Sequence, residues 1–341
     1  MKYFVREKNT DRYAFHTAGV KARVDADAIL QKNGYIPIDI NFVGRRSGNV
    51  RSIFQHAEIA SLFKEKLRFL RPDDTLVIQF PPINHSIFFK GVVRALVMRG
   101  VTVTALIHDL ETIRLSNSDD LPVATRFRLK REEVSVLALF SRLIVHNDSM
   151  RRYLSKTLGI PSVRMRVLGI FDYLTDAPLC KPSDSVTVAG NLSMQKAGYV
   201  YYLPDGVDFL LYGPSYEGIP LKNVTYRGSF APNKLPYVLE GGFGLVWDGD
   251  SPDTCTGVFG NYLRYNAPHK TSLYLALGIP VIIWDKAALA DFVIKNNCGI
   301  AVSSLDLIPS AIKTADVPQL RAGAVEISKK LRSGYFLSSA L

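Results

Sequence analysis

The sequence predicts an α/β protein with two doubly wound domains. Short apolar runs that suit buried parallel strands alternate with helical segments along the whole chain. A length of 341 residues, with 47% hydrophobic and 11% aromatic residues, is sufficient for two cores of ordinary size. A proline-containing stretch with few apolar residues, 176–184, divides the alternating series in two.

The N-terminal half predicts one parallel sheet. We expect its strands at residues 1–7, 35–42, 75–80, 101–107, 143–145 and 167–170. We expect its helices at residues 24–33, 57–70, 88–99, 132–140 and 150–158. The polar segment 110–127 is expected to be a mobile loop over a ligand cleft.

The C-terminal half predicts a second sheet of the same kind. Its expected strands are 185–189, 209–214, 224–228, 243–247, 281–284 and 298–302. Its expected helices are 231–239, 268–277 and 285–296, followed by two more after Leu307, the last of which carries Gly334-Tyr335-Phe336. The predicted domains are therefore 1–178 and 179–322, with a terminal helix at 323–341.

The helix that begins at Pro268 carries the clearest chemical signal. Its first residues are His269, Lys270, Thr271 and Ser272. A helix N-terminus has free N–H groups and a partial positive charge, so this end can hold a phosphate group and stabilise a departing diphosphate. A solvated first-turn lysine explains Lys270 equally well.

Two further strand ends suggest donor-site contacts. Asn191 and Lys196 follow the strand 185–189 and form a second candidate phosphate contact. Tyr212, at the end of the next strand, has a ring that could stack on a base, although a rim tyrosine needs no function.

The dipeptide His108-Asp109 directly follows the strand 101–107. Ligands of open α/β sheets bind outside the carboxyl ends of strands. Asp109 is therefore a candidate base for an acceptor hydroxyl, directly or through His108, while a turn-capping role is equally compatible. Gly19 and Lys21, at the first strand–helix turn, are candidate cleft residues, with a simple loop as the alternative.

Composition narrows the class of partner. The net charge is +11, and basic residues concentrate in the N-terminal half, at 45–46, 64–71, 126–131 and 151–152. Weak aromatic interleaving favours an anionic membrane surface over nucleic acid, and several solvated helix faces of one sign are the alternative. We expect no nucleic acid partner.

No secretory signal, and no apolar run of about 18 residues or more, is found in the sequence. The three cysteines lack metal-ligand spacing and are expected to be reduced, in the cytoplasm. Asp248-Gly249-Asp250 is the nearest match to a metal–nucleotide motif, in a setting that also suits a plain loop. We expect no metal and no other cofactor.

Several blocks resemble a known family. They are Gly190-Asn191 with Lys196, Gly241-Gly242-Phe243-Gly244-Leu245-Val246-Trp247, Lys270 through Ile282, Ile107-His108-Asp109, Val145 through Asp148 and Gly169 through Leu174. The chain is similar to bacterial glucosyltransferase 3-like proteins, and more so to the related β-1,6-galactofuranosyltransferases. Lys196 stands where that family has an arginine, after a slightly longer loop.

The resemblance implies a GT-B fold, in which two Rossmann-like domains face a central cleft. It implies a UDP-sugar donor in the C-terminal domain, at Asn191, Lys196, Tyr212, Gly242 and the 269–272 turn. The acceptor, a glycan or lipid-linked glycan, would meet Gly19, Lys21 and His108-Asp109 in the N-terminal domain. The terminal helix would cross back to that domain.

The function expected from this resemblance is metal-independent, inverting transfer of a hexosyl unit, galactofuranose or otherwise glucose, in polysaccharide or glycoprotein synthesis. The alternative is a catalytically idle nucleotide-sugar-binding or scaffold subunit. Peripheral contact with the inner face of the cytoplasmic membrane is expected from the charge, and a homo-oligomer remains open.

Overall fold

The computed structural model describes residues 1–8, 18–41, 49–115, 122–218 and 221–341, and these form two compact units, each built on a six-stranded parallel sheet. The first unit comprises the N-terminal strand and Ala26–Leu168, with Ala340. The second comprises Gly169–Ser339, Leu341 and the described start of the first helix up to Asp25. The basic pair 45–46 lies outside the described residues.

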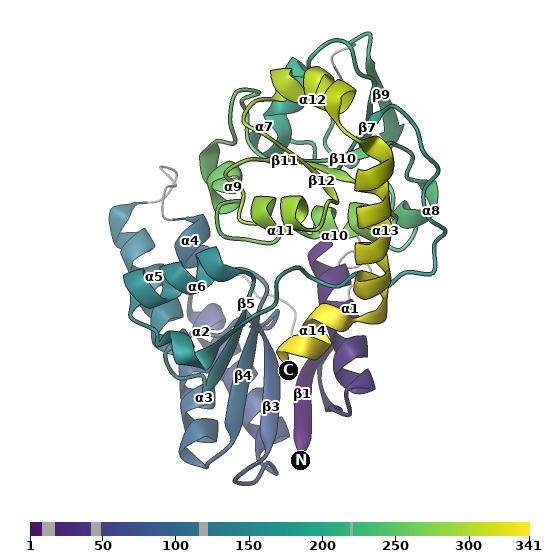
Figure 1. Cartoon of the computed structure of the whole chain (residues 1–341). Helices are drawn as coiled ribbons and strands as arrows, with labels where there is room; N and C mark the ends of the chain where they lie inside the picture. Colours follow the sequence, from purple (N-terminus) through teal and green to yellow (C-terminus); the bar gives the residue numbers. More distant parts are fainter. Residues whose placement is uncertain (9–17, 42–48, 116–121, 219–220) are drawn as a thin grey trace. The chain divides into compact units, whose positions relative to one another are not determined.

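The first sheet has the strand order β2-β1-β3-β4-β5-β6. Its strands are β1 (Lys2–Lys8), β2 (Ile36–Asn41), β3 (Thr75–Phe80), β4 (Thr102–Ile107), β5 (Arg142–Val145) and β6 (Met165–Val167). The helices described along this part of the chain are α1 (Ala18–Lys32), α2 (Asn49–Leu67), α3 (Phe89–Met98), α4 (Glu111–Arg114), α5 (Val123–Leu137), α6 (Asp148–Leu158) and the 3-10 helix η2 (Ser162–Arg164). Figure 1 shows α2, α3, α5 and α6 on the other side of this sheet from α1.

The second sheet has the order β12-β11-β10-β7-β8-β9. Its strands are β7 (Val186–Ala189), β8 (Phe209–Tyr212), β9 (Val224–Gly228), β10 (Phe243–Val246), β11 (Val281–Trp284) and β12 (Gly299–Val302). The helices of its described residues are α7 (Met194–Ala197), η3 (Gly198–Tyr202), α8 (Leu235–Val238), α9 (Gly257–Tyr262), α10 (His269–Ala276), α11 (Ala290–Lys295), η4 (Leu305–Leu307), α12 (Ile308–Thr314), α13 (Val317–Ser333) and α14 (Tyr335–Ala340).

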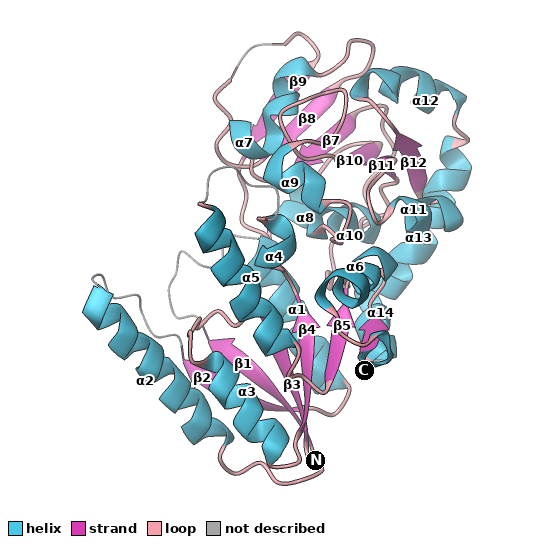
Figure 2. Ribbon diagram, turned by 90° about the vertical axis from the view of Figure 1, so that its left-hand side faces the viewer, coloured by secondary structure: helices cyan, strands magenta, loops and turns pink. Residues whose placement is uncertain are grey.

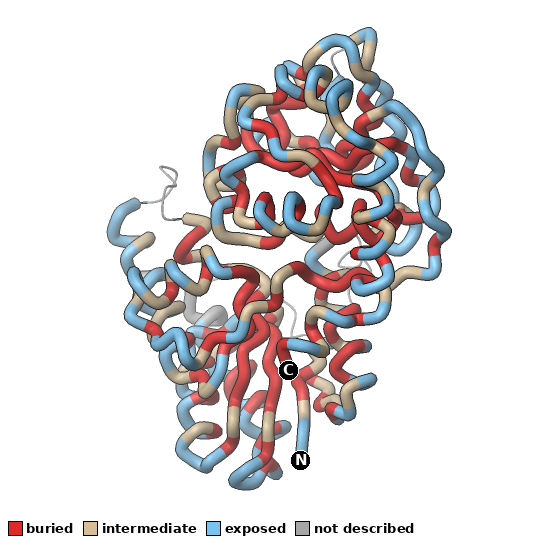
Figure 3. The backbone as a smooth tube through the Cα atoms, viewed as in Figure 1, coloured by how far each residue is buried: buried red, intermediate tan, exposed pale blue. Residues whose placement is uncertain are grey.

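Each expected strand overlaps an observed strand. The central strands, such as β3, β4, β10 and β11, are apolar runs that are almost entirely buried. Strands β3, β9 and β11 have the predicted bounds. Strand β6 ends at Val167, where the predicted strand 167–170 begins, and the remaining strands differ by one or two residues at an end. In Figure 3 the strands of both units are mostly red, which marks them as buried. Figure 2 shows helices packed around each set of strands. The connections between parallel strands contain helices, and these helices cover both faces of each sheet.

The expected loop 110–127 is wrong as a description of the segment. Helix α4 occupies its start and α5 begins at Val123 rather than at residue 132. The reason is a tertiary contact: the Glu133 carboxylate accepts hydrogen bonds from the backbone N–H groups of Glu111 and Thr112, at 3.0 and 2.8 Å. Two otherwise unsatisfied donors of α4 are met by this side chain. The polar residues 116–121 lie outside the described part.

Two expectations about chain organisation also differ from the structure. The stretch after Leu168 packs with the second unit: Ala177 is fully buried, and the Cys180 N–H donates to Leu277 O at 2.9 Å. The compact units thus divide before the predicted boundary at 178. Three helices rather than two follow Leu307, because Gly334 takes a left-handed conformation (φ 77°), ends α13 and lets α14 begin.

Candidate active site

The second sheet has its topological switch point between β7 and β10, where the strand order reverses. Ligands of doubly wound sheets bind beside the carboxyl ends of strands at such a point. The chain leaves β10 at Trp247 and returns through α9 to the start of α10. Because α10 follows β10 and leads to the parallel strand β11, its N-terminus lies on the side of the sheet where β10 ends.

Lys270 is held in a buried ion pair at this edge. Its Nζ lies 2.8 Å from Asp248 Oδ1 and donates to Trp247 O at 2.9 Å. The two side chains are only 13% and 7% exposed. This geometry fixes the ammonium group beside the first turn of α10, and the interpretation as a freely solvated lysine does not fit the structure.

The rest of the α10 first turn leaves polar atoms without partners. His269 Nε2 and Thr271 Oγ1 are buried and have no hydrogen bond within the part of the chain that the structure describes. Burial, together with the nearby positive charge of Lys21, lowers the pKa of His269 to about 3, so the imidazole is neutral. Pro268 is the N-cap residue and provides no side-chain cap. This helix end is therefore equipped to accept a ligand that supplies the missing partners.

Ser272 does not join that group. Its Oγ is buried and donates to Phe171 O at 2.7 Å, which ties α10 to the segment after β6. The structure thus separates the four predicted residues of this turn: one cation in an ion pair, two side chains with unpartnered atoms, and one structural hydroxyl.

The loop after β7 lies against the loop after β10. Gly249 N–H donates to Lys196 O at 2.8 Å, and Tyr199 N–H donates back to Gly249 O at 3.3 Å. The Lys196 ammonium lies 5.0 Å from the centre of the Phe259 ring, on α9. The structure therefore brings Lys196 to the same edge of the sheet as the Lys270–Asp248 pair.

Asn191 is exposed, and its Oδ1 accepts the Ser193 N–H at 3.0 Å, which shapes the turn into α7. Tyr212 is 2% exposed, and its hydroxyl accepts the Glu240 N–H at 3.2 Å. It is therefore a core residue of β8 in this structure rather than a rim residue.

Gly242 is not brought to this site. It precedes β10 at the amino edge of the sheet, where its N–H donates to Ser185 O at 2.8 Å. A Cβ atom there would lie 1.7 Å from Ser183 O. Its glycine identity is explained by close strand packing, at the opposite edge from α10.

Lys21 is also committed to structure within the second unit. Its ammonium contacts both carboxylate oxygens of Asp25, at 2.5 and 2.6 Å, and Leu174 O at 2.6 Å. It also lies 4.5 Å from the centre of the Tyr173 ring, whose neighbour is the His269 ring at 5.0 Å. Burial raises the pKa of Asp25 despite this partner.

Gly19 is exposed, with no atom within 4 Å of a Cβ built on it. An acceptor contact for Gly19 or Lys21 stays a prediction.

In the first unit, a hydrogen-bonded chain leads to His108. The Gln79 amide nitrogen donates to Asp27 at 2.6 Å, and its amide oxygen lies 2.6 Å from His108 Nε2. The Asp27 carboxylate can only accept, so Gln79 must direct its amide nitrogen to Asp27 and its amide oxygen to His108. The amide oxygen is itself an acceptor, so His108 Nε2 must carry the proton. The acceptor nitrogen of the ring is then Nδ1, as a general base requires.

Asp109 follows His108 at the end of β4. Burial is the main reason that the pKa of Glu111 is raised, and the negative charge of Asp109 raises it further. The sequence interpretation missed Gln79 and Asp27, because helix α1, which carries Asp27, and strand β3, which carries Gln79, are brought together only by folding. It considered Asp248 only as part of a metal–nucleotide motif or a plain loop and did not pair it with Lys270, although its position directly after a buried strand was a usable signal. The roles of all these residues stay predictions.

Among the described residues, no group of three or more His, Cys, Asp or Glu side chains could hold a metal ion. The same residues contain no helix long and apolar enough to cross a membrane.

The fold is that of the GT-B glycosyltransferases. The sucrose-phosphate synthase of Thermosynechococcus elongatus superposes with a TM-score of 0.63 at 12% identity, covering 98% of this chain and 95% of that one. An E. coli trehalose-6-phosphate protein bound with UDP-2-fluoro glucose gives 0.62 at 12% identity, covering 99% of each chain. WaaG, a glycosyltransferase involved in lipopolysaccharide biosynthesis, gives 0.54 at 12% identity, with 100% and 97% covered.

The chain belongs to the glucosyltransferase 3-like family, whose N-terminal domain matches residues 3–170 and whose C-terminal domain matches residues 186–341. It is 35% identical to the β-1,6-galactofuranosyltransferase WbbI of Escherichia coli K12, with 99% of this chain and 97% of that one covered. Glucosyltransferase 3 of Streptococcus gordonii is 23% identical, with 79% and 78% covered. The protein is thus a glycosyltransferase, and the predicted family and enzyme class are confirmed.

Proposed function

We propose that this glycosyltransferase moves a hexosyl unit from a UDP-sugar to a sugar hydroxyl with inversion, and that the sugar is galactofuranose, or otherwise glucose. The observation that carries the proposal is the 35% identity with WbbI over nearly the whole of both chains. A β-linked product made by one displacement on an α-configured sugar nucleotide requires inversion. The weaker similarity to glucosyltransferase 3 is the reason for glucose as the second choice.

The α10 end supports a diphosphate donor. The diphosphate would accept hydrogen bonds from the N–H groups at the helix end and from the buried side-chain atoms His269 Nε2 and Thr271 Oγ1, while Lys270 and Lys196 would offset its charge. These groups favour the state in which the C1–O bond breaks and negative charge grows on the departing UDP. Because two lysines and a helix end supply positive charge here, we expect transfer to persist in a metal chelator.

The acceptor hydroxyl would attack C1 and lose its proton to Asp109 or to His108 Nδ1. The hydrogen bond from His108 Nε2 to Gln79 would hold the ring in the tautomer that accepts this proton. The acceptor we propose is a sugar of a cell-surface glycan or lipid-linked glycan, reached in the cytoplasm at the inner face of an anionic membrane.

Thermal unfolding against a panel of nucleotides, in the presence of EDTA, tests the donor class. A ligand that binds only the folded state raises the unfolding midpoint by mass action. We expect a shift with UDP and UDP-sugars and none with ADP or GDP. No shift with any nucleotide, for a protein shown to be folded, would count decisively against the proposed donor.

Asp109→Asn then separates an enzyme from an idle subunit. Loss of a general base costs about 10²- to 10⁴-fold in rate. We expect this variant to lose UDP-galactofuranose turnover while it keeps the UDP-dependent thermal shift. If the unmodified protein binds UDP but transfers no sugar to any acceptor tested, the role of a nucleotide-sugar-binding subunit is favoured.

A further inference from the structure

A groove of about 600 Å³ runs between α2 and α3 of the first unit, and none of the candidate site residues named above lines it. The two helices pack through an edge-on contact of Phe63 with Phe89, whose ring centres are 5.3 Å apart. Ser86 Oγ also donates to His56 O at 2.6 Å and fastens the start of α3 to α2. The groove is therefore a built feature of two well-packed helices.

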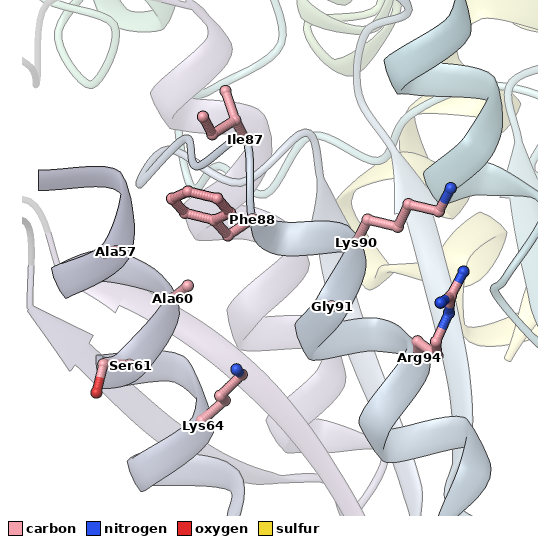
Figure 4. Close-up of a pocket in the computed structure, with 9 residues that line it drawn as sticks. All are labelled: Ala57, Ala60, Ser61, Lys64, Ile87, Phe88, Lys90, Gly91 and Arg94. Carbon is pink, nitrogen blue, oxygen red and sulfur yellow. The ribbon is translucent and has the colours of Figure 1, made fainter. Parts of the chain in front are cut away.

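Small residues make the floor of this groove. Ala57, Ala60 and Ser61 line it from α2, and Gly91 faces them from α3 (Figure 4). A Cβ built on Gly91 meets no atom within 4 Å. A larger residue at Gly91 would fit the helix and occupy the groove, so the space depends on the absence of a side chain there.

Three cationic residues line the groove: Lys64 on α2, and Lys90 and Arg94 on α3. In Figure 4 the Lys64 side chain extends between the two helices, and the Lys90 and Arg94 side chains extend from α3 toward the side away from α2. In the ranges that the structure describes, none of the three makes an ion pair or a side-chain hydrogen bond, and no acidic residue lines the groove. Three positive charges around a concave surface with no counter-charge favour an anionic group such as a phosphate.

Apolar side chains stand at the mouth of the groove. Ile87 is 46% exposed and Phe88 is 43% exposed, both at the start of α3. On α2, Ile53 is 55% exposed and lies one turn before Ala57, on the same helix face. Exposed apolar side chains next to unpaired cations are typical of surfaces that lie in the interfacial layer of an anionic membrane.

We propose that this groove binds the phosphate group of an anionic phospholipid and docks the first unit on the membrane, with Ile87 and Phe88 in the interfacial layer. This assigns a location to the membrane contact proposed above, and it does not depend on which sugar is transferred. The occupant is a phospholipid rather than a free phosphate, because the apolar mouth has no partner in an aqueous anion.

The test is sedimentation of the full chain with vesicles of phosphatidylcholine alone or mixed with phosphatidylglycerol. Each basic residue near an anionic surface contributes about fivefold to binding, so Lys64→Gln/Lys90→Gln/Arg94→Gln should weaken binding to the mixed vesicles about a hundredfold. The charge-matched control Lys222→Gln/Lys234→Gln/Lys313→Gln changes three exposed cations of the second unit and should weaken it far less. Equal losses in the two triple variants would overturn the proposal.

Two further variants separate the groove from net charge. Gly91→Leu leaves the charge unchanged and should still reduce binding, whereas unaltered binding would show that the groove is not occupied. Phe88→Trp adds a half-exposed indole, and its emission should shift to the blue with mixed vesicles. No shift would contradict insertion.

Competition and activity measurements distinguish a phospholipid from other anions that could occupy the groove. If inorganic pyrophosphate or a short RNA displaces the protein from vesicles at equal phosphate concentration, the site takes free anions or nucleic acid and the proposal fails. Transfer to a soluble acceptor should be unchanged in the groove variant. Loss of vesicle binding with intact turnover therefore tests the groove independently of the transferase function.

Discussion

Replacing Lys270 with methionine should both weaken donor binding and destabilise the second unit. The substitution removes the ammonium that lies 2.8 Å from Asp248 and 2.9 Å from Trp247 O, and it keeps most of the apolar stem. Asp248 would remain as a carboxylate that is 7% exposed and has lost its cation. The Lys270→Met variant therefore tests whether the same lysine both stabilises the fold and binds the donor.

The size of the expected loss in stability follows from the burial of the Lys270–Asp248 pair. Breaking a buried ion pair by removing one partner costs about 3–5 kcal/mol, because a charge is left uncompensated. For a domain of this size, that corresponds to a fall of roughly 6–20 °C in the unfolding midpoint. Loss of a charged hydrogen bond to phosphate, about 1.5–3 kcal/mol, should weaken UDP binding by roughly 10- to 150-fold.

The fluorescence of the two tryptophans of the chain provides the assay of unfolding. Trp247 and Trp284 are fully buried in the second sheet, so intrinsic fluorescence on heating or in urea reports the unfolding of this unit. UDP affinity is measured separately by titration well below the midpoint of each variant.

The double variant Lys270→Met/Asp248→Asn is the matched control. It removes the stranded charge, so it should recover at least about 2 kcal/mol of the lost stability while UDP binding stays weak. A single variant that loses less than about 1 kcal/mol, or a double variant no more stable than the single one, would refute the reasoning about the pair. Unchanged UDP affinity would refute the phosphate assignment.

Three more predictions concern stability and the proposed base. Burial raises the pKa of Asp172 to about 7, so the folded protein retains a proton that the unfolded chain releases near pH 4. This group should lower the free energy of unfolding by up to about 4 kcal/mol as the pH rises between those values, and Asp172→Asn should reduce the slope in urea titrations at several pH values; an unchanged slope would contradict the assignment. Gly244→Ala would place a Cβ 2.2 Å from the Tyr274 ring and should destabilise the second unit by about 1–3 kcal/mol or more, and an unchanged midpoint would contradict the packing. Gln79→Leu removes the hydrogen-bond partner of His108 and should lower kcat about 10- to 100-fold with a shifted pH profile and an unaltered KM for the donor; a loss confined to KM would exclude this positioning role.

The sequence alone determined the fold class and the strands, for a physical reason. Parallel strands buried on both faces must be continuous apolar runs, and a run such as Val281–Trp284 can be identified without knowledge of its partners. Helix ends set by the chain itself were also predictable, as at Gly159, where the left-handed backbone (φ 70°) ends α6. The glycine-rich and lysine-containing blocks carried the family resemblance, which the comparisons confirm.

Only the tertiary structure decided which polar residues have partners. Asp248 pairs with Lys270 across 22 positions, Gln79 meets His108 across 29, and Glu133 caps a helix whose residues appeared to be a loop. The sequence places such residues at strand and helix ends, but their distances depend on how distant segments pack. Gly242 shows the converse. Its glycine run indicated a site, whereas Gly242 precedes β10 at the amino edge of the sheet, where a Cβ would meet the backbone of Ser183.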